Sequence, residues 1–274
     1  MRITVGSLFS GIGGLDLGLE WAGLGPVIWQ VEREPFCRAV LAKHWPGAER
    51  FEDVCAVGSH CLRPVDLICG GFPCQDLSYA GKGAGLAGER SGLWREYARI
   101  VCELRPRFVV VENVSALLSR GLGTVLGDLA ALGYDAEWHC IPAAAVGAPH
   151  LRDRLFIVAY TNSAGLEGRR EPKPESADQR ATGEGGAARP DNDGERGAQS
   201  GLGRAVARLP GRVDRWPARP RKAQHDWEAP RVCAVRRGDN RAARIKALGN
   251  TAVPQVAEVV GHIVMRIARR LEAA

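Results

Sequence analysis

The chain places a cysteine on a stiff turn that directly follows a short apolar segment. The turn runs Gly70-Gly71-Phe72-Pro73-Cys74-Gln75, and residues 65–69 before it have the composition of a buried strand. Proline fixes its own φ angle and restricts the residue before it, so Pro73 limits where the thiol of Cys74 can lie. Open α/β sheets bind ligands at the carboxyl ends of their strands. Cys74 is therefore a candidate nucleophile, and a buried structural thiol is the alternative.

A carboxylate and two arginines occur at comparable places. Glu112-Asn113-Val114 closes the β-branched run of residues 109–111. A carboxylate at the end of an apolar strand is well placed for a raised pKa and an acid role, although it could equally cap the next helix. Arg152 and Arg154 enter a strand-like run that starts at residue 155. Because they are two residues apart on a strand, they face the same side and could bind an anion or a base carbonyl. The alternative is that both lie at a solvated edge and have no functional role.

A glycine-rich turn, Phe9-Ser10-Gly11-Ile12-Gly13-Gly14, lies between the first predicted strand and the first predicted helix. Glycines there let the backbone approach a ligand closely and leave the helix N-terminus open to it. The run departs from the G-x-G-x-x-G dinucleotide pattern because its last two glycines are adjacent. Glu32 ends the second strand, where an acidic residue commonly accepts hydrogen bonds from a ribose diol. Together they indicate a cofactor that carries a nucleoside but few phosphate groups. The alternative is a purely structural turn beside a solvated glutamate.

The elements that must position these residues alternate along the first 160 residues. Such alternation predicts an α/β fold with a doubly wound, mostly parallel sheet. We expect strands at residues 3–9, 27–32, 66–70, 108–112, 136–141 and 155–160. We expect helices at residues 15–22, 35–44, 93–104 and 122–132.

Beyond residue 160 the composition changes. Residues 161–204 contain no aromatic residue, which predicts a flexible insert because too little apolar surface can be buried. Residues 205–246 are basic and contain Trp216 and Trp227, which favours a small separate fold. Residues 247–274 end in a helix from Pro254 that should pack back on the domain of residues 1–160. Its predicted apolar face consists of Val256, Val260, Ile263, Ile267 and Leu271.

The net charge of +6 is concentrated in the variable segment. Residues 161–246 hold 19 Lys or Arg and 12 Asp or Glu, so they carry +7 and the rest of the chain carries −1. A basic excess confined to one segment is expected of a surface that faces a polyanion. A solvated, arginine-rich insert without a partner is the alternative.

Composition also excludes several classes of protein. Hydrophobic residues make up 45% of the 274 residues, enough for a full core. The eight cysteines include no C-x-x-C pair and no accompanying histidine cluster, so we expect no metal. Met1-Arg2 leads straight into a strand-like run, and no apolar run approaches membrane-spanning length. A cytoplasmic monomer with free thiols is the expectation.

In this order, the features resemble those of the C5-cytosine DNA methyltransferases. The series is the glycine turn, the acidic second strand, the Pro-Cys turn, Glu-Asn-Val, Arg-x-Arg, a basic variable segment and Gly249-Asn250-Thr251-Ala252-Val253-Pro254. The resemblance covers residues 3–160 and 245–272 nearly without a break. It implies a Rossmann-like, S-adenosylmethionine-dependent methyltransferase fold, with residues 161–246 as a small basic, partly flexible target-recognition insert.

The resemblance also implies roles for individual residues. Cys74 matches the nucleophile that attacks C6 of a flipped-out cytosine. Glu112 matches the group that holds N3 and the exocyclic amine of the base. Arg154 matches the contact to the base carbonyl, and Arg152 matches its supporting neighbour. The implied cofactor contacts are Phe9, Gly11, Gly13, Gly14, Glu32, Asp53, Pro73 and Asn250, with Asp53 toward the adenine amino group. The implied substrate or loop contacts are Gln75, Ser78, Asn113 and Thr251.

The implied activity is that of a DNA (cytosine-5-)-methyltransferase, with double-stranded DNA as partner and S-adenosylmethionine as methyl donor. A transfer RNA cytosine-5 methyltransferase is the nearest alternative. A catalytically inactive DNA-binding relative is disfavoured by the intact set of Cys74, Glu112 and Arg154. A nucleotide-dependent oxidoreductase is disfavoured by the missing G-x-G-x-x-G. The sequence does not decide whether a cognate restriction endonuclease is a further partner.

Overall fold

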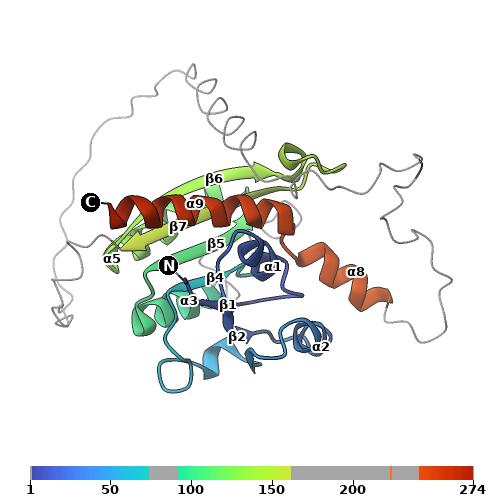
Figure 1. The fold of residues 1–274 in the computed structure, drawn as a ribbon, viewed down its shortest axis with the longest axis horizontal. Coiled ribbons are helices and arrows are strands. Elements are labelled where there is room, and N and C mark those ends of the chain that lie inside the picture. Colours follow the sequence, from blue (N-terminus) through green and yellow to red (C-terminus); the bar gives the residue numbers. More distant parts are fainter. Residues whose placement is uncertain (1, 74–91, 162–222, 224–240, 274) are drawn as a thin grey trace, which may run out of the picture.

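The computed structural model describes residues 2–73, 92–161, 223 and 241–273 (Figure 1). Within these ranges the strands form one sheet in the order β3-β2-β1-β4-β5-β7-β6. In chain order they are β1 (Val5–Leu8), β2 (Val27–Val31), β3 (Glu49–Phe51), β4 (Leu67–Gly70), β5 (Phe108–Val114), β6 (Tyr134–Pro142) and β7 (Asp153–Thr161).

The sheet is mostly parallel, as predicted. β1 pairs in parallel with β2 and β4, β2 with β3, and β4 with β5. β7 runs antiparallel to both β5 and β6. The chain winds outward from β1 in one direction to β3 and then returns to β4 on the other side of β1. Such a reversal opens a crevice at the carboxyl ends of the two central strands, which is where ligands bind in doubly wound sheets.

The predicted strands are all present, and β3 is an additional one that the sequence did not predict. β3 has only three residues, Glu49, Arg50 and Phe51, and lies at the edge of the sheet. Two of those residues are charged, so no alternating or continuous apolar pattern marks the strand. β6 and β7 extend to nine residues each, beyond the predicted segments, because they pair with each other over their whole length.

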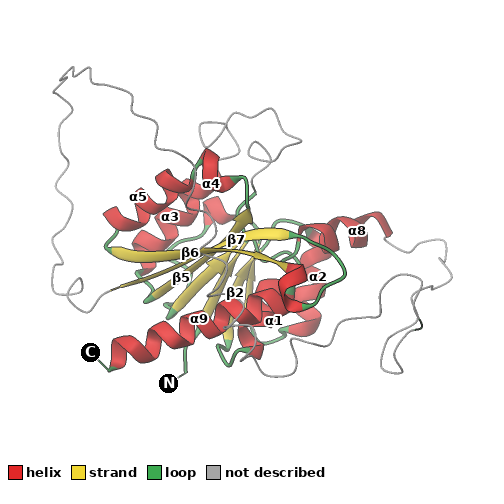
Figure 2. Ribbon diagram, turned by 90° about the horizontal axis from the view of Figure 1, so that it is seen from above, coloured by secondary structure: helices red, strands yellow, loops and turns green. Residues whose placement is uncertain are grey.

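Helices cover both faces of the sheet (Figure 2). α1 (Gly14–Trp21) and α9 (Pro254–Glu272) lie on one face, and α3 (Gly92–Leu104) and α5 (Leu122–Ala131) lie on the other. α2 (Pro35–His44) has the predicted bounds, and α1, α3 and α5 begin and end within one residue of the predicted ones. The shorter elements are η1 (Val54–Ala56), α4 (Leu117–Arg120) and η4 (Ala143–Val146).

α9 packs on α1 and on the sheet through an apolar face that differs partly from the predicted one. Val256, Val260 and Ile267 are buried as expected. Ile263 and Leu271 are only partly buried, whereas Val259 and Val264 are buried in their place. The buried face is broader than the predicted stripe because α9 contacts α1, β7 and η4 together.

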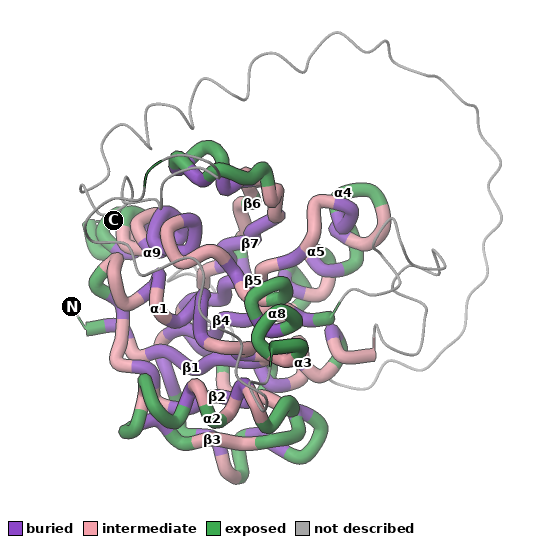
Figure 3. Tube along the Cα trace, turned by 90° about the vertical axis from the view of Figure 1, so that its right-hand side faces the viewer, coloured by how far each residue is buried: buried purple, intermediate pink, exposed green. Residues whose placement is uncertain are grey.

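α8 (Arg241–Asn250) is the most exposed helix in the described part of the chain (Figure 3). It begins inside the basic segment of residues 205–246 and continues across the predicted boundary at residue 247. Ala247 is its one buried residue, and Lys246 forms an ion pair with Glu34 at 2.6 Å. No helix among the described residues is long and apolar enough to cross a membrane.

Candidate active site

The glycine turn leaves β1 at the centre of the sheet and brings its backbone close to β2. Phe9 and Gly13 have φ angles of 53° and 81°, and the glycine adopts this left-handed conformation without strain. The Ser10 amide donates to the Val31 carbonyl at 3.2 Å. The ring of Phe9 stacks on buried Tyr97 of α3 with centroids 6.4 Å apart. The turn is therefore held between two neighbouring elements before α1 begins.

Glu32, just after β2, contacts the turn directly. Its Oε2 accepts a hydrogen bond from the Gly11 amide at 2.7 Å, and its Oε1 accepts one from the Glu34 amide at 2.8 Å. A Cβ atom added at Gly11 would meet nothing within 4 Å, so the turn faces open space. A carboxylate with spare lone pairs beside an open glycine turn fits a ligand that carries a hydroxyl pair.

The C-terminal motif joins the start of α1 to the arginine segment. Thr251 Oγ1 accepts a hydrogen bond from the Gly14 amide at 3.2 Å. The Thr251 carbonyl accepts one from Arg152 Nη2 at 2.6 Å. Thr251 thus caps α1 and anchors Arg152, two functions that linear spacing could not show because the residues lie far apart in the sequence.

A small cavity lies where these segments meet. Four parts of the chain that are remote in sequence line it: the glycine turn, the end of β4, the end of β5 and the C-terminal motif. The lining residues include Ser7, Phe9, Gly11, Gly71, Glu112 and Asn250. Glu32 and Asp53 lie outside this lining.

Glu112 presents its carboxylate to this cavity from β5. Its side chain is 12% exposed, and its Oε1 lies 3.2 Å from Arg154 Nε. Burial raises the pKa of Glu112, and the charges of Arg154 and Arg152 oppose that rise. A Cβ atom at Gly71 would come within 2.6 Å of Glu112 Oε2, so a side chain there would displace this carboxylate. The site therefore holds a buried acid whose protonated form is favoured relative to a solvated glutamate.

The two arginines do not act as a same-side pair on a strand, which corrects the expectation from their spacing. β7 begins at Asp153, and Arg152 precedes it with a φ angle of 32°. The guanidinium of Arg152 binds Thr251, whereas that of Arg154 pairs with Glu112. Burial and the charge of Arg154 lower the pKa of Arg152, so the two guanidiniums remain electrostatically coupled.

Cys74, Gln75 and Ser78 lie outside the described residues, but the chain just before Cys74 is well anchored. Asn113 Nδ2 donates to the Phe72 carbonyl at 3.2 Å. Asn113 Oδ1 accepts from the Val114 amide at 2.8 Å, and the residue is only 3% exposed. This buried amide fixes the backbone two residues before Cys74. Exposed Pro73 is the last described residue of the turn.

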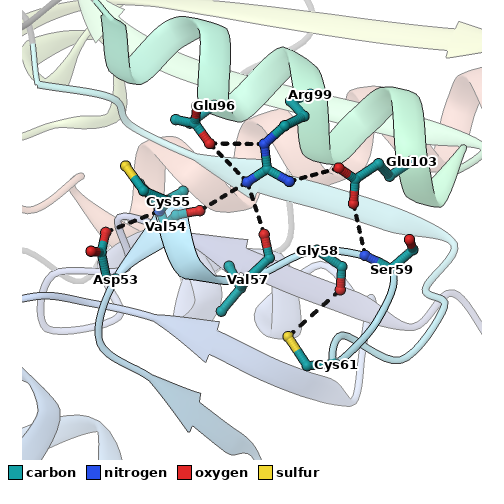
Figure 4. A network of polar contacts seen from close by, with 10 residues as sticks. All are labelled: Asp53, Val54, Cys55, Val57, Gly58, Ser59, Cys61, Glu96, Arg99 and Glu103. Atoms are coloured by element: carbon teal, nitrogen blue, oxygen red, sulfur yellow. Dashed lines mark hydrogen bonds and ion pairs between the residues drawn. The ribbon is translucent and has the colours of Figure 1, made fainter.

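Asp53 caps η1, and Arg99 ties that turn to α3 (Figure 4). Asp53 Oδ1 accepts from the Cys55 amide at 2.9 Å. Arg99 donates to the carbonyls of Val54 and Val57 at 3.1 and 2.8 Å, and it forms ion pairs at 2.7 Å with two acids of its own helix, Glu96 and Glu103. The sequence did not single out Arg99, because a charged residue on an amphipathic helix is ordinarily assigned to its solvated face.

Comparison with known proteins agrees with this geometry. The sequence profile described as C-5 cytosine-specific DNA methylase matches residues 3–195 of the chain. The chain belongs to the C-5 cytosine-specific DNA methylase family. The match includes the glycine turn, the Pro-Cys turn, Glu112 and both arginines, so the resemblance predicted from the motifs is confirmed.

Several curated relatives are type II methyltransferases. M2.BsuMI of Bacillus subtilis is 36% identical over 57% of this chain and 42% of its own length. M.Eco47II of Escherichia coli is 40% identical over 58% of this chain and 40% of its own length. M.AquIA of Picosynechococcus is 32% identical over 56% of this chain and 69% of its own length. The chain thus spans less than half the length of the first two relatives.

Solved structures support the fold. A DNA modification methyltransferase encoded within an E. coli prophage has a TM-score of 0.51 at 28% identity, covering 61% of this chain and 48% of its own. A methyltransferase of Entamoeba histolytica has a TM-score of 0.53 at 16% identity, over 66% and 58% of the two chains. Together with the sheet order, these similarities confirm the predicted methyltransferase fold.

Proposed function

We propose that the chain is a DNA (cytosine-5-)-methyltransferase that uses S-adenosylmethionine and acts through Cys74. The observation that carries the proposal is the convergence of three groups at one cavity. These are the open glycine turn, Glu112 with its ion-pair partner Arg154, and Gly71, which precedes the Phe72 carbonyl that Asn113 holds. Family membership and the type II methyltransferase relatives support the same activity.

The residues present fit the proposed cofactor. Phe9, Gly11 and Asn250 line the cavity, and the Glu32 carboxylate lies against the same turn for the ribose diol. Asp53 would meet the adenine amino group, and Gly13, Gly14 and Pro73 would complete the pocket. S-adenosylmethionine, when bound, supplies an electrophilic methyl group. Among the described residues, no group of three or more His, Cys, Asp or Glu could hold a metal ion.

The chemistry assigned to the protein starts with the cysteine. C5 of cytosine is a poor nucleophile, so the Cys74 thiolate first adds to C6 and the electron pair of the C5–C6 double bond makes C5 electron-rich. Glu112 contacts N3 and the exocyclic amine and gives a proton to the nitrogen on which negative charge develops. Its raised pKa favours the protonated form that this step needs. C5 would then take the methyl group that S-adenosylmethionine supplies. Loss of the C5 proton and of the thiolate, with return of the added proton to Glu112, restores the aromatic base.

The arginines and the loop complete the proposed site. Arg154 pairs with Glu112 and contacts the base carbonyl, and Arg152 is anchored by the Thr251 carbonyl. The target carbon is inaccessible inside a duplex, so the cytosine must be flipped out of the helix. Residues 75–92, which include Gln75 and Ser78, would close over it. The basic residues 205–246 would contact the DNA and read the target.

Bisulfite sequencing of DNA from cells that express the chain tests this function. We expect protected cytosines in one sequence context, absent from cells that express Cys74→Ala. Because the match covers less than half of two of the relatives, the purified protein should also be assayed alone on unmethylated DNA and on transfer RNA. Methylation of transfer RNA alone, or no methylation of either, would contradict the proposed substrate.

A further inference from the structure

A buried carboxylate that takes no part in the proposed chemistry is hydrogen-bonded to a residue that lines the cavity. Asp16, in the first turn of α1, has no exposed surface. Its Oδ1 accepts a hydrogen bond from Ser7 Oγ at 2.6 Å, and its Oδ2 accepts one from Gln30 Nε2 at 2.7 Å. The thiol of Cys69 lies 3.8 Å from Oδ1. Asp16 faces the sheet, whereas Ser7 also lines the cavity.

The three partners form one row across the central strands. Ser7 of β1 pairs in register with Gln30 of β2 on one side and with Cys69 of β4 on the other. One carboxylate therefore connects α1 to three adjacent strands at the same level of the sheet. Two of its bonds are short and charge-assisted, which makes them stronger and more directional than contacts between neutral groups.

Each strand in this row leads within a few residues into the proposed site. Ser7 is two residues before Phe9, and Gln30 is two residues before Glu32. Cys69 begins the path through Gly71 to Cys74, and α1 itself starts at the last glycine of the turn. Packing alone does not call for a charge here, because an apolar side chain would fill the space without the cost of desolvating a carboxylate. What the carboxylate adds is a fixed orientation of the strand ends.

We propose that Asp16 is a positioning residue, which holds the cofactor turn, Glu32 and residues 70–73 in fixed relation to one another. The consequence for catalysis rests on the function proposed above. The positioning itself does not, because it concerns the free protein. Small misplacements of reacting groups are costly in this kind of site, since a shift of about 1 Å can lower a rate by about 100-fold.

Asp16→Ala, Asp16→Asn and a matched control test the proposal. Asp16→Ala removes both acceptors. Asp16→Asn keeps an acceptor for Ser7, and its amide can donate to Gln30 Oε1, which has no hydrogen-bond partner among the described residues. The control is Asp66→Ala. Asp66 Oδ2 accepts hydrogen bonds from the Thr4 amide and hydroxyl at 2.8 and 2.6 Å. It therefore joins the amino ends of β1 and β4, whereas the proposed site lies at their carboxyl ends.

Three measurements are made on each purified variant. In the free protein, Asp16→Ala should speed amide hydrogen exchange of residues 9–14 and 70–72 by about tenfold or more, and Asp66→Ala should not. Affinity for S-adenosylhomocysteine and kcat/KM for methyl transfer should fall by about 100-fold in Asp16→Ala, with Asp16→Asn recovering most of the loss. If Asp16→Ala does not fold, Gln30→Leu serves instead, since it cuts only the bond to β2 and should loosen residues 31–34.

The proposal is overturned if Asp16→Ala loses stability as Asp66→Ala does while exchange at residues 9–14 and 70–72 stays at the wild-type rate. It is also overturned if Asp16→Asn is as impaired as Asp16→Ala. A wild-type protein that neither binds S-adenosylhomocysteine nor transfers methyl would refute the proposed function. The exchange comparison would still decide whether Asp16 positions the strand ends.

Discussion

At the residue scale, the site depends on two buried carboxylates with different surroundings. Glu112 lies beside two arginines, and Asp16 lies among a hydroxyl, an amide and a thiol. Burial raises the pKa of both, but Glu112 alone has cationic neighbours that oppose the shift. The first is therefore suited to gain and lose a proton at a bound base, and the second to hold its neighbours in place.

Glu112→Gln should depress turnover far more than cofactor affinity. The amide keeps the shape of the side chain but cannot give up a proton to N3, and general acid catalysis of this kind typically contributes about 10²- to 10⁴-fold. Single-turnover methylation and S-adenosylhomocysteine binding are measured on the same preparation. If binding fell more than turnover, Glu112 would be a cofactor or structural residue instead.

The contribution of Asp16 to stability should depend on pH. Burial raises its pKa from 3.8 to about 6; bonds from Ser7, Gln30 and Cys69 oppose the rise and Glu20 adds to it. Between pH 3.8 and about 6, the folded state therefore holds a proton that the unfolded state has lost. The contribution of Asp16 to the free energy of unfolding is complete below about pH 3.8 and disappears as pH rises through about 6. Urea unfolding of wild type and Asp16→Asn should show the variant gaining roughly 3 kcal/mol relative to wild type across that window. A constant difference would contradict the assignment.

At the element scale, α3 connects the two ends of the proposed site. It begins at Gly92, directly after the segment that carries Cys74, and its Arg99 holds the turn that begins at Asp53. Tyr97 on the same helix supports Phe9 and donates to the Val110 carbonyl at 3.0 Å. The helix therefore links the adenine side of the proposed pocket to β5, the strand that carries Glu112.

Arg99→Lys should weaken cofactor binding with little effect on the chemical step. A lysine keeps the charge but cannot serve two carbonyls and two carboxylates from one planar group. Without Arg99, the turn that begins at Asp53 should loosen and Asp53 should lose its position beside the adenine 6-amino group. We therefore expect an affinity loss of about tenfold for S-adenosylhomocysteine and a smaller loss for an analogue without that amino group. Arg266→Lys is the control, since Arg266 makes one exposed ion pair with Glu137. Equal losses for both ligands would show that Arg99 does not act through Asp53.

The sequence predicted those elements that have a strong apolar pattern. The β-branched run before Glu112 and the periodic helices at Pro35 and Pro254 appear where expected, since buried strands and amphipathic helices carry their own signal. β3 and α8 were missed because neither buries a regular apolar face. Spacing predicted Glu112 and the arginines as site residues, but the roles of Asn113, Thr251 and Asp16 depend on long-range contacts that only the fold reveals.

At the scale of the whole molecule, the basic charge and the catalytic site belong to different parts of the chain. Residues 162–204 hold seven Lys or Arg and eight Asp or Glu. Residues 205–246 hold 12 Lys or Arg and only four Asp or Glu. The excess that could meet DNA phosphates is thus confined to the second stretch. Most of it lies outside the described residues, and its assignment to target recognition remains a prediction.

Neutralising Arg212, Arg215, Arg219 and Arg221 together should weaken DNA binding and flatten its salt dependence, because fewer counterions are released from the phosphates. Deletion of residues 162–204 is the matched comparison. That deletion removes slightly more acidic than basic residues, so the salt slope and the target sequence should both persist. A change of target after the deletion alone would show that residues 162–204 read the DNA.

The central claim, covalent catalysis by Cys74, is tested most directly with DNA that carries 5-fluorocytosine at the target. Fluorine cannot leave C5 as a proton does, so the adduct between Cys74 and C6 cannot be resolved after methylation. We expect wild-type protein with S-adenosylmethionine to give a protein–DNA complex that survives a denaturing gel, and Cys74→Ala to give none. An active wild-type protein that leaves no such complex, or a complex that persists in Cys74→Ala, would contradict the mechanism.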